Sequence, residues 1–157
     1  MTHDLAVSKE IAAPAELVWT MVSDLPRMGE WSPESEGGTW LGSATAPTPG
    51  AKFRGVNRNG KKRWKSAVTV LDADPGRRFS FRVSALGLKV AEWGYTFEPT
   101  STGCIVTETW TDQRNPIMKS LSGKATGVPD RASHNRAGME QTLERLAAAA
   151  QSGATPS

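Results

Sequence analysis

The stretch WGYTFEPTSTGCIVTETW, residues 93–110, has the pattern of two strands joined by a turn. Apolar and polar residues alternate on both sides of the PTSTG sequence, as they do in a half-buried antiparallel hairpin. Folding the chain at that turn predicts that Trp93 faces Trp110 and that Tyr95 faces Glu108. A carboxylate is therefore expected on the same side of the sheet as several large rings.

The preceding segments continue this alternation, so we predict a meander of strands over residues 50–113. Asn59-Gly60 is a strong signal for a two-residue hairpin turn, and it predicts that Arg58 pairs with Lys61. An antiparallel sheet with one apolar face and one polar face needs a single cover on the apolar side.

Two later turns set the register in the centre of the sheet. The sequence DADPG predicts that Val70 faces Phe79, and LGL at 86–88 predicts that Phe81 faces Trp93, with a left-handed glycine in the loop. The face expected to be apolar carries Ala51, Phe53, Gly55, Trp64, Ser66, Val68, Val70, Phe79, Phe81, Val83, Ala91, Trp93, Tyr95, Phe97, Val106, Glu108 and Trp110.

The N-terminal part predicts a strand followed by short helical segments. Residues 5–11 alternate as a strand, and APAELVWTMVSDL has apolar residues at helical spacing after Pro14. Pro26 and the sequence GEWSPESEGG interrupt that helix, and Trp40 is expected on a short second strand.

A long helix near the C-terminus is the predicted cover of the sheet. It begins after Asp130, a suitable N-cap, and is rich in good helix formers. Spacings of three and four residues produce one inward stripe. The members of this stripe are Asn135, Met139, Thr142, Leu143 and Leu146.

The composition describes one globular domain, which we expect to span residues 1–150, followed by a disordered tail at 151–157. With 157 residues, 38% apolar residues and a net charge of +3, the chain is of ordinary domain size and only mildly basic. We therefore expect no nucleic-acid partner, and we expect a monomer or a homodimer. A lone cysteine, Cys104, favours the reducing cytoplasm, and the N-terminus lacks the pattern of a signal peptide.

No cofactor or metal ion is expected. The sequence contains none of the glycine-rich phosphate-binding motifs and no H-E-x-x-H motif, and its two histidines supply little material for a zinc site. No apolar run approaches the roughly 20 residues needed to span a bilayer, so stable membrane insertion is not expected either.

The order of these elements resembles the START-like or Bet v 1-like (SRPBCC) superfamily, in particular small bacterial polyketide cyclase/dehydrase and lipid-transport-like proteins. The segments that carry the resemblance cover nearly the whole chain. They are IAAPAELVWTMVSDLPRMGEWSPE (11–34), PGAKFRGVNRNGKKRW (49–64), DPGRRFSFRV (74–83), WGYTFEPTSTGCIVTETW (93–110) and HNRAGMEQTLERL (134–146).

The resemblance implies an α+β helix-grip fold, in which a curved seven-stranded antiparallel sheet wraps around a long C-terminal helix. It also implies two short helices after the first strand and a cavity between sheet and helix. Members of the superfamily hold sterols, lipids, plant hormones, flavonoids or polyketides there, and a minority catalyse aromatic ring cyclisation or dehydration. The fold alone does not choose among these activities.

Glu108 is the main candidate for chemistry, because a carboxylate facing an apolar pocket has a raised pKa unless a cation or several donors stabilise it. Three interpretations are open: Glu108 contacts a ligand, it is satisfied structurally by Tyr95 or Lys9, or it faces solvent. The tryptophans likewise either contact ligand or fill core, and Trp31, in a polar loop bounded by prolines, is the one expected at the cavity mouth. The expected ligand-binding residues are Trp31, Phe53, Trp64, Phe81, Trp93, Tyr95, Glu108, Trp110, Asn135 and Met139.

Three functions follow from these features. The favoured one is non-catalytic binding of a small, mostly apolar molecule such as a lipid, a polyketide or an aromatic metabolite. The alternative is a cyclase or dehydratase that uses Glu108 as its acid or base. A second alternative is a toxin-like or regulatory interaction protein whose outer face or 115–129 segment is active.

Overall fold

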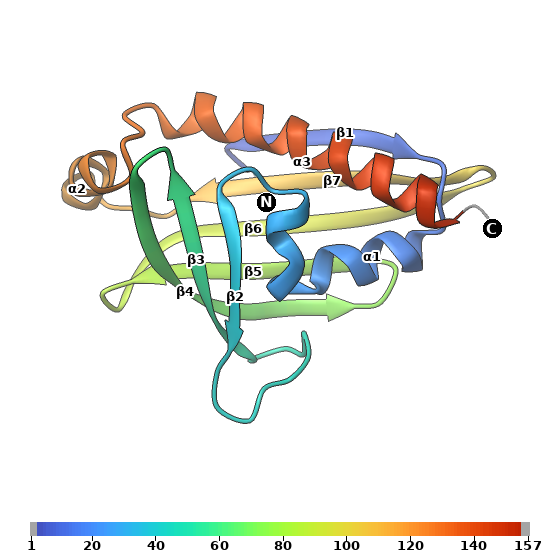
Figure 1. The fold of residues 1–157 in the computed structure, drawn as a ribbon, viewed down its shortest axis with the longest axis horizontal. Helices are drawn as coiled ribbons and strands as arrows, with labels where there is room; N and C mark the ends of the chain where they lie inside the picture. The colour runs from blue at the N-terminus through green and yellow to red at the C-terminus, as the bar shows by residue number, and fades with distance from the viewer. Residues whose placement is uncertain (1–2, 155–157) are drawn as a thin grey trace.

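The computed structural model describes residues 3–154 and shows an α+β helix-grip fold (Figure 1). One antiparallel sheet of seven strands has the order β1-β7-β6-β5-β4-β3-β2, which confirms the predicted architecture. The strands are β1 (Leu5–Ile11), β2 (Ser35–Trp40), β3 (Lys52–Asn59), β4 (Lys62–Asp74), β5 (Arg78–Ala85), β6 (Leu88–Thr100) and β7 (Gly103–Asp112). The helices are α1 (Ala15–Ser23), the 3-10 helix η1 (Leu25–Glu30), α2 (Pro116–Thr126) and α3 (Arg131–Ala154).

The sheet curves strongly, and α3 lies across its concave side. In Figure 1, β5, β6 and β7 run along the direction of α3, whereas β2 and β3 run across it, and the β3–β4 hairpin lies beside α2. A β-bulge between Val70 and Asp72 lies in the long strand β4, which joins the two parts of the sheet. Bulges bend and twist a strand, so this one contributes to the change of direction.

The predicted pairs in β5, β6 and β7 are confirmed. Trp93 lies opposite Trp110, and Tyr95 lies opposite Glu108. On the other side of β6, Phe81 lies opposite Trp93. These side chains therefore lie on the predicted face, and only after Val83, near the tip of the β5–β6 hairpin, does the register shift.

The β3–β4 hairpin differs from its predicted register by two residues. Asn59 pairs with Lys62 instead of occupying the turn, which is formed by Gly60 and Lys61. The side-chain amide of Asn59 donates a hydrogen bond to the carbonyl oxygen of Thr126, at 2.9 Å, and this holds Asn59 in the strand. Because the displacement is an even number of residues, every side chain stays on its predicted face.

The β4–β5 pairing is also displaced from the prediction. Val70 faces Phe81, whereas the sequence predicted Phe79, and beyond the bulge Phe79 faces Ala73. The DADPG turn alone does not reveal the bulge, which adds an unpaired residue to β4. Val70 and Phe79 nevertheless remain buried on the inner face.

The ends of α3 are largely as expected. Asp130 accepts a hydrogen bond from the backbone N–H of Ser133, at 3.2 Å, which confirms it as the capping residue. At the other end the helix continues to Ala154, beyond the expected domain boundary at 150, so residues 151–154 are helical rather than part of a tail. The rest of the expected tail, 155–157, lies outside the described residues.

The second half of α3 closes the core at one end of the sheet. Its apolar side chains pack with Ile11 and Cys104 from β1 and β7 and with Val18 and Val22 from α1. Burying such side chains is the main favourable term in folding. The members of this half are Leu143, Leu146, Ala147 and Ala150, all buried.

Replacing Leu143 by alanine tests this packing. The side chain is 1% exposed, so Leu143→Ala is expected to lower the free energy of unfolding by about 2–5 kcal/mol. The exposed neighbour Arg145 is the matched control, and Arg145→Ala is expected to change stability by less than about 0.5 kcal/mol. Chemical denaturation would measure both, and equal effects would contradict the assignment of α3 as the core cover.

Candidate functional site

A cavity of about 670 Å³ lies between the sheet and the first half of α3. Its walls also include residues of α2, η1 and the segment that leads into β2. Most of the wall atoms are apolar, as in sites for small organic molecules. The wall residues from the sheet are Phe53, Gly55, Asn57, Trp64, Lys65, Ser66, Val68, Phe81, Val83, Ser84, Ala85, Leu88, Val90, Ala91, Trp93, Tyr95, Glu108 and Trp110, together with Gly37 of β2.

The helix α3 divides into a half that lines this cavity and a half that fills the core. Apart from Met139, the cavity half carries polar or small residues in place of large apolar ones, among them Gly138, where the helix presents no side chain to the cavity. This explains why the sheet face is densely covered at one end only. The cavity residues of α3 are Arg131, His134, Asn135, Gly138, Met139 and Thr142.

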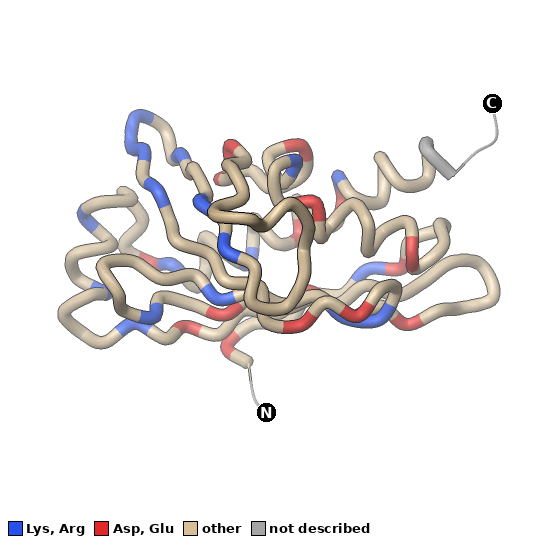
Figure 2. The backbone as a smooth tube through the Cα atoms, turned by 90° about the horizontal axis from the view of Figure 1, so that it is seen from below, with Lys and Arg blue, Asp and Glu red and all other residues tan. Residues whose placement is uncertain are grey.

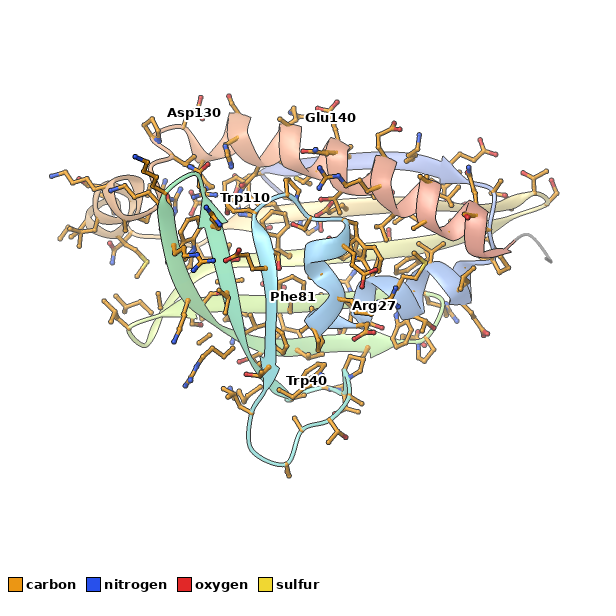
Figure 3. All side chains as sticks on the ribbon, in the orientation of Figure 1. Arg27, Trp40, Phe81, Trp110, Asp130 and Glu140 are labelled. Atoms are coloured by element: carbon orange, nitrogen blue, oxygen red, sulfur yellow. The ribbon has the colours of Figure 1, made fainter. Side chains whose placement is uncertain are left out.

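Nine of the ten expected ligand-binding residues line the cavity. Phe81 and Trp110 lie on the inner side of the sheet in Figure 3, whereas Asp130 and Glu140 lie on the outer side of α3. The Trp93 and Trp110 rings are 6.4 Å apart, and they form a broad aromatic wall beside Glu108. The nine are Phe53, Trp64, Phe81, Trp93, Tyr95, Glu108, Trp110, Asn135 and Met139.

Trp31 is the exception, because it is a core residue and not a residue of the cavity mouth. It is 1% exposed and belongs to the main apolar cluster. The guanidinium of Arg27 lies over its ring, 5.2 Å from the centroid. The polar loop around Trp31 suggested exposure, but the 3-10 helix η1 turns the ring inward beneath that cation.

Glu108 and Tyr95 form the polar centre of the cavity. They lie opposite each other on β7 and β6, and the Tyr95 hydroxyl donates a hydrogen bond of 2.8 Å to Oε2 of Glu108. The second oxygen, Oε1, is buried and has no hydrogen-bond partner among the described residues. Lys9, the other partner considered from the sequence, instead pairs with Glu144 on the outer side, at 3.0 Å.

Burial changes the acidity of both groups. Glu108 is 3% exposed, and loss of hydration raises its pKa from 4.5 to about 8, although the hydrogen bond from Tyr95 acts in the opposite direction. Burial also raises the pKa of Tyr95 well above 10, and the nearby Glu108 adds to this effect. Glu108 is therefore largely a neutral carboxylic acid at pH 7.

The neutral acid at position 108 has a specific chemical capacity. Because Oε2 already accepts the Tyr95 hydrogen bond, a proton on Oε1 places an O–H donor on the oxygen that no described residue contacts by a hydrogen bond. A protonated carboxyl group donates one hydrogen bond and still accepts others. Such a group matches a carbonyl or a hydroxyl, and it can also exchange a proton with one.

A second polar cluster borders the cavity where α3 begins. Arg131 donates hydrogen bonds to both carboxylate oxygens of Glu34, at 2.8 and 3.0 Å, and another to Thr126. His134 contacts the same carboxylate at 2.9 Å, and Asn135 accepts from Arg131 at 3.4 Å. The cluster joins α2, α3 and the segment before β2, so it holds the wall together at this end.

Sequence reasoning missed most of that cluster. Neither Glu34 nor Arg131 was singled out, and His134 is an exposed residue that contacts Glu34 from the surface. Their spacing on α3 was a usable signal, because Arg131 and Asn135 are four residues apart and share one face. The contact with Glu34 had no local signal, since it joins segments about one hundred residues apart.

The described residues show no cluster of three or more His, Cys, Asp or Glu side chains that could hold a metal ion. Among residues 3–154, no helix has both the length and the hydropathy that crossing a bilayer requires. Cys104 is buried at the start of β7, and burial raises the pKa of its thiol. It therefore packs as a small apolar side chain.

A single protein-family model matches nearly the whole chain. The family described as "Polyketide cyclase / dehydrase and lipid transport" matches residues 2–151. None of the curated proteins compared with the chain matches it.

Solved structures with the same fold include bacterial proteins of this type. The polyketide-cyclase-like protein Cgl2372 from Corynebacterium glutamicum is 30% identical, with a TM-score of 0.62 over 91% of this chain and 88% of its own. A START superfamily protein from Mycobacterium smegmatis has a TM-score of 0.66 at 16% identity, over 96% and 99% of the two chains. The di-domain ARO/CYC protein StfQ of the steffimycin biosynthetic pathway has a TM-score of 0.72 at 16% identity, and the match covers 96% of this chain and 51% of StfQ.

The raised pKa of Glu108 predicts how stability depends on pH. Between about 4.5 and 8 the folded protein keeps a proton on Glu108 that the unfolded chain releases. The free energy of unfolding should therefore fall as pH rises through this window, by up to about 1.4 kcal/mol per pH unit, and level off above it. Glu108→Gln should remove this contribution.

Denaturant titrations across this pH window would measure the effect. Glu144→Gln, the same change at an exposed position of α3, is the matched control and should keep the wild-type dependence. An identical pH dependence in wild type and Glu108→Gln would contradict a protonated Glu108 in the folded state.

Proposed function

Because the chain belongs to the polyketide cyclase / dehydrase and lipid transport family of the START-like superfamily, we propose that its cavity binds one small, mostly apolar molecule. That molecule carries at least one carbonyl or hydroxyl oxygen, which pairs with Glu108. The Trp93, Trp110 and Phe81 rings contact its apolar body. The classes that fit this description are lipids, polyketides and aromatic metabolites.

The observation that carries the proposal is the unpartnered oxygen of Glu108 in a mostly apolar cavity. A buried polar atom without a hydrogen bond costs about 1–3 kcal/mol, so its retention calls for a partner that residues 3–154 do not supply. A ligand oxygen would be that partner. The volume of about 670 Å³ lies in the range of about 300–1,000 Å³ that is usual for sites of small organic ligands.

Further polar groups in the wall are suited to a ligand with more than one oxygen. Asn57 donates a hydrogen bond to Ser66, at 3.1 Å, and both side chains line the cavity from the sheet. Asn135 lines it from α3. A flat ring system between the aromatic walls, with oxygens near Glu108 and near these amides, would satisfy both kinds of contact.

Binding without catalysis is the favoured form of this function, and a cytoplasmic location with no cofactor remains our expectation. One specific observation favours a second candidate, a cyclase or dehydratase. An acid or base works best when its pKa lies near the operating pH, and the pKa of Glu108 is about 8. Under this candidate Glu108 exchanges a proton with an enolisable ketone while Tyr95 orients its carboxyl group.

The binding proposal predicts a bound molecule and a specific loss in one variant. Native mass spectrometry of protein from its own host should show a co-purifying compound. Titration of the emptied protein with that compound should show that Glu108→Gln weakens binding by about 0.5–3 kcal/mol, because glutamine keeps a donor but not the acid proton. Glu144→Gln should bind as wild type does, and absence of any bound compound together with no binding of lipids, polyketides or aromatic compounds would refute the proposal.

The enzymatic candidate predicts a different outcome for the same variant. Glu108→Gln should lower turnover of a polyketide-type substrate by about 100-fold or more, with little change in affinity. The rate should also change with pH around 8, the pKa of Glu108. Steady-state kinetics would measure both, and unchanged turnover in Glu108→Gln would exclude this residue as acid or base.

A further inference from the structure

Exposed apolar residues that also line the cavity gather at one end of the molecule, on α2 and the β5–β6 hairpin, so the cavity reaches the surface there, at what we call its mouth. Among the described residues, every large apolar side chain that is exposed lies at this end. Leu86 and Leu88 come from the hairpin, with 97% and 49% exposure, and Ile117 and Leu121 come from α2, with 73% and 61%. All four also line the cavity, so the apolar surface is continuous from inside to outside.

No contact within the described residues explains why position 86 carries a leucine. It lies at the tip of the hairpin, followed by Gly87, and its φ of 54° is in the left-handed region that leucine rarely adopts. A glycine or an asparagine would suit that position better and would expose no apolar surface. A leucine at this position stabilises the protein only when a binding partner buries the hairpin tip.

The same end of the molecule is strongly basic. Three segments approach the mouth: the β3–β4 hairpin and the strand after it (59–71), the β5–β6 hairpin (82–91) and the α2 region (113–129). None of the 16 acidic residues falls in these segments. Their cations are Lys61, Lys62, Arg63, Lys65, Arg82, Lys89, Arg114, Lys119 and Lys124.

Figure 2 shows blue on the hairpins and on the helix at this end, while most red lies toward the middle and the other end. Part of this charge is neutralised internally, because Asp112 pairs with Arg114 at 2.8 Å and lies 3.9 Å from Lys119. Lys89 and Lys124, which flank the apolar residues of the hairpin and of α2, are exposed. Exposed cations beside exposed apolar side chains complement a surface that is both anionic and apolar.

We propose that this end of the protein docks on the surface of an anionic lipid bilayer. Leu86, Leu88, Ile117 and Leu121 enter the headgroup region, and the neighbouring lysines contact the lipid phosphates. The mouth then faces the bilayer, so an apolar ligand passes between membrane and cavity without crossing water. This last step rests on the ligand-binding function proposed above, whereas the docking itself does not.

The shape of the rim favours a membrane over a protein partner. The exposed apolar residues sit on two separate projections at the same end of the molecule, the tip of the β5–β6 hairpin and the short helix α2, and all four line the cavity. A protein partner would have to cover both projections and close the mouth. A planar bilayer contacts both at once and leaves the opening facing apolar lipid.

Vesicle flotation with purified protein tests the docking. Wild type should bind phosphatidylcholine vesicles that contain about 30% phosphatidylglycerol, and should bind pure phosphatidylcholine far more weakly. Raising the salt from about 0.1 M to about 1 M shortens the screening length from about 10 Å to about 3 Å and should weaken binding. Binding that is absent, or equal on both kinds of vesicle, would overturn the proposal.

Two pairs of substitutions locate the contact. Leu86→Asn with Ile117→Gln should reduce vesicle binding on the order of tenfold or more, while the melting temperature is kept, because both side chains are exposed and asparagine tolerates a positive φ. Lys89→Gln with Lys124→Gln should reduce it about 25-fold, at about fivefold for each lysine. Arg136→Gln with Arg145→Gln removes the same charge from the exposed side of α3 and should have a much smaller effect.

The outcomes separate docking from ligand binding. Equal losses in the lysine pair and the arginine pair would mean a diffuse charge effect and would overturn docking through the mouth. Unchanged binding in the Leu86→Asn, Ile117→Gln variant would do the same. If wild type fails to bind vesicles but still binds its co-purified compound, the docking proposal is wrong and the cavity proposal stands; the reverse result refutes only the cavity proposal.

Discussion

The structure depends on one geometrical constraint, which is that α3, with α1 and η1 beside it, must cover a sheet face that is larger than these helices. Strand alternation puts most aromatic rings of the meander on one side of the sheet, where they require a cover. The second half of α3 supplies it through Leu143 and Leu146, which pack with β1, β7 and α1. The first half carries Asn135, Gly138 and Thr142 at corresponding positions, and these do not fill the space. The cavity is what remains of an apolar face that its helix covers only in part.

Glu108 acquires its properties from that incomplete cover. A carboxyl group on the inner face is removed from water whether or not a cation is present, and within residues 3–154 only the Tyr95 hydroxyl donates a hydrogen bond to Glu108. Desolvation therefore dominates, and the pKa rises to about 8. A one-residue slip of β7 against β6 would turn Glu108 to the outer face and bring Thr107 or Thr109 inside. The register of the β6–β7 hairpin therefore decides whether an acidic group lies in the cavity.

The two ends of the molecule differ in a related way. At the end where α1 meets the second half of α3, apolar side chains are buried and the sheet is closed. At the end where α2 meets the β5–β6 hairpin, apolar side chains such as Leu86 and Ile117 are exposed around an opening. Lysines surround the open end, and the Glu34–Arg131 ion pair fixes the position of the adjoining wall. Apolar side chains line the cavity from that opening to Glu108.

The sequence by itself determined the element order, the inner face and the pairs Tyr95–Glu108 and Trp93–Trp110, because alternation and a short turn are both local and agree with each other. Tertiary structure decided what local patterns do not encode. Asn59 left its predicted turn to bond Thr126, and Trp31 was buried by the way η1 packs on β2. Tertiary structure also decided the cavity and the ion pairs around it, because they depend on how distant segments pack. The alternation of apolar and polar residues does not predict how much space two packed elements leave between them.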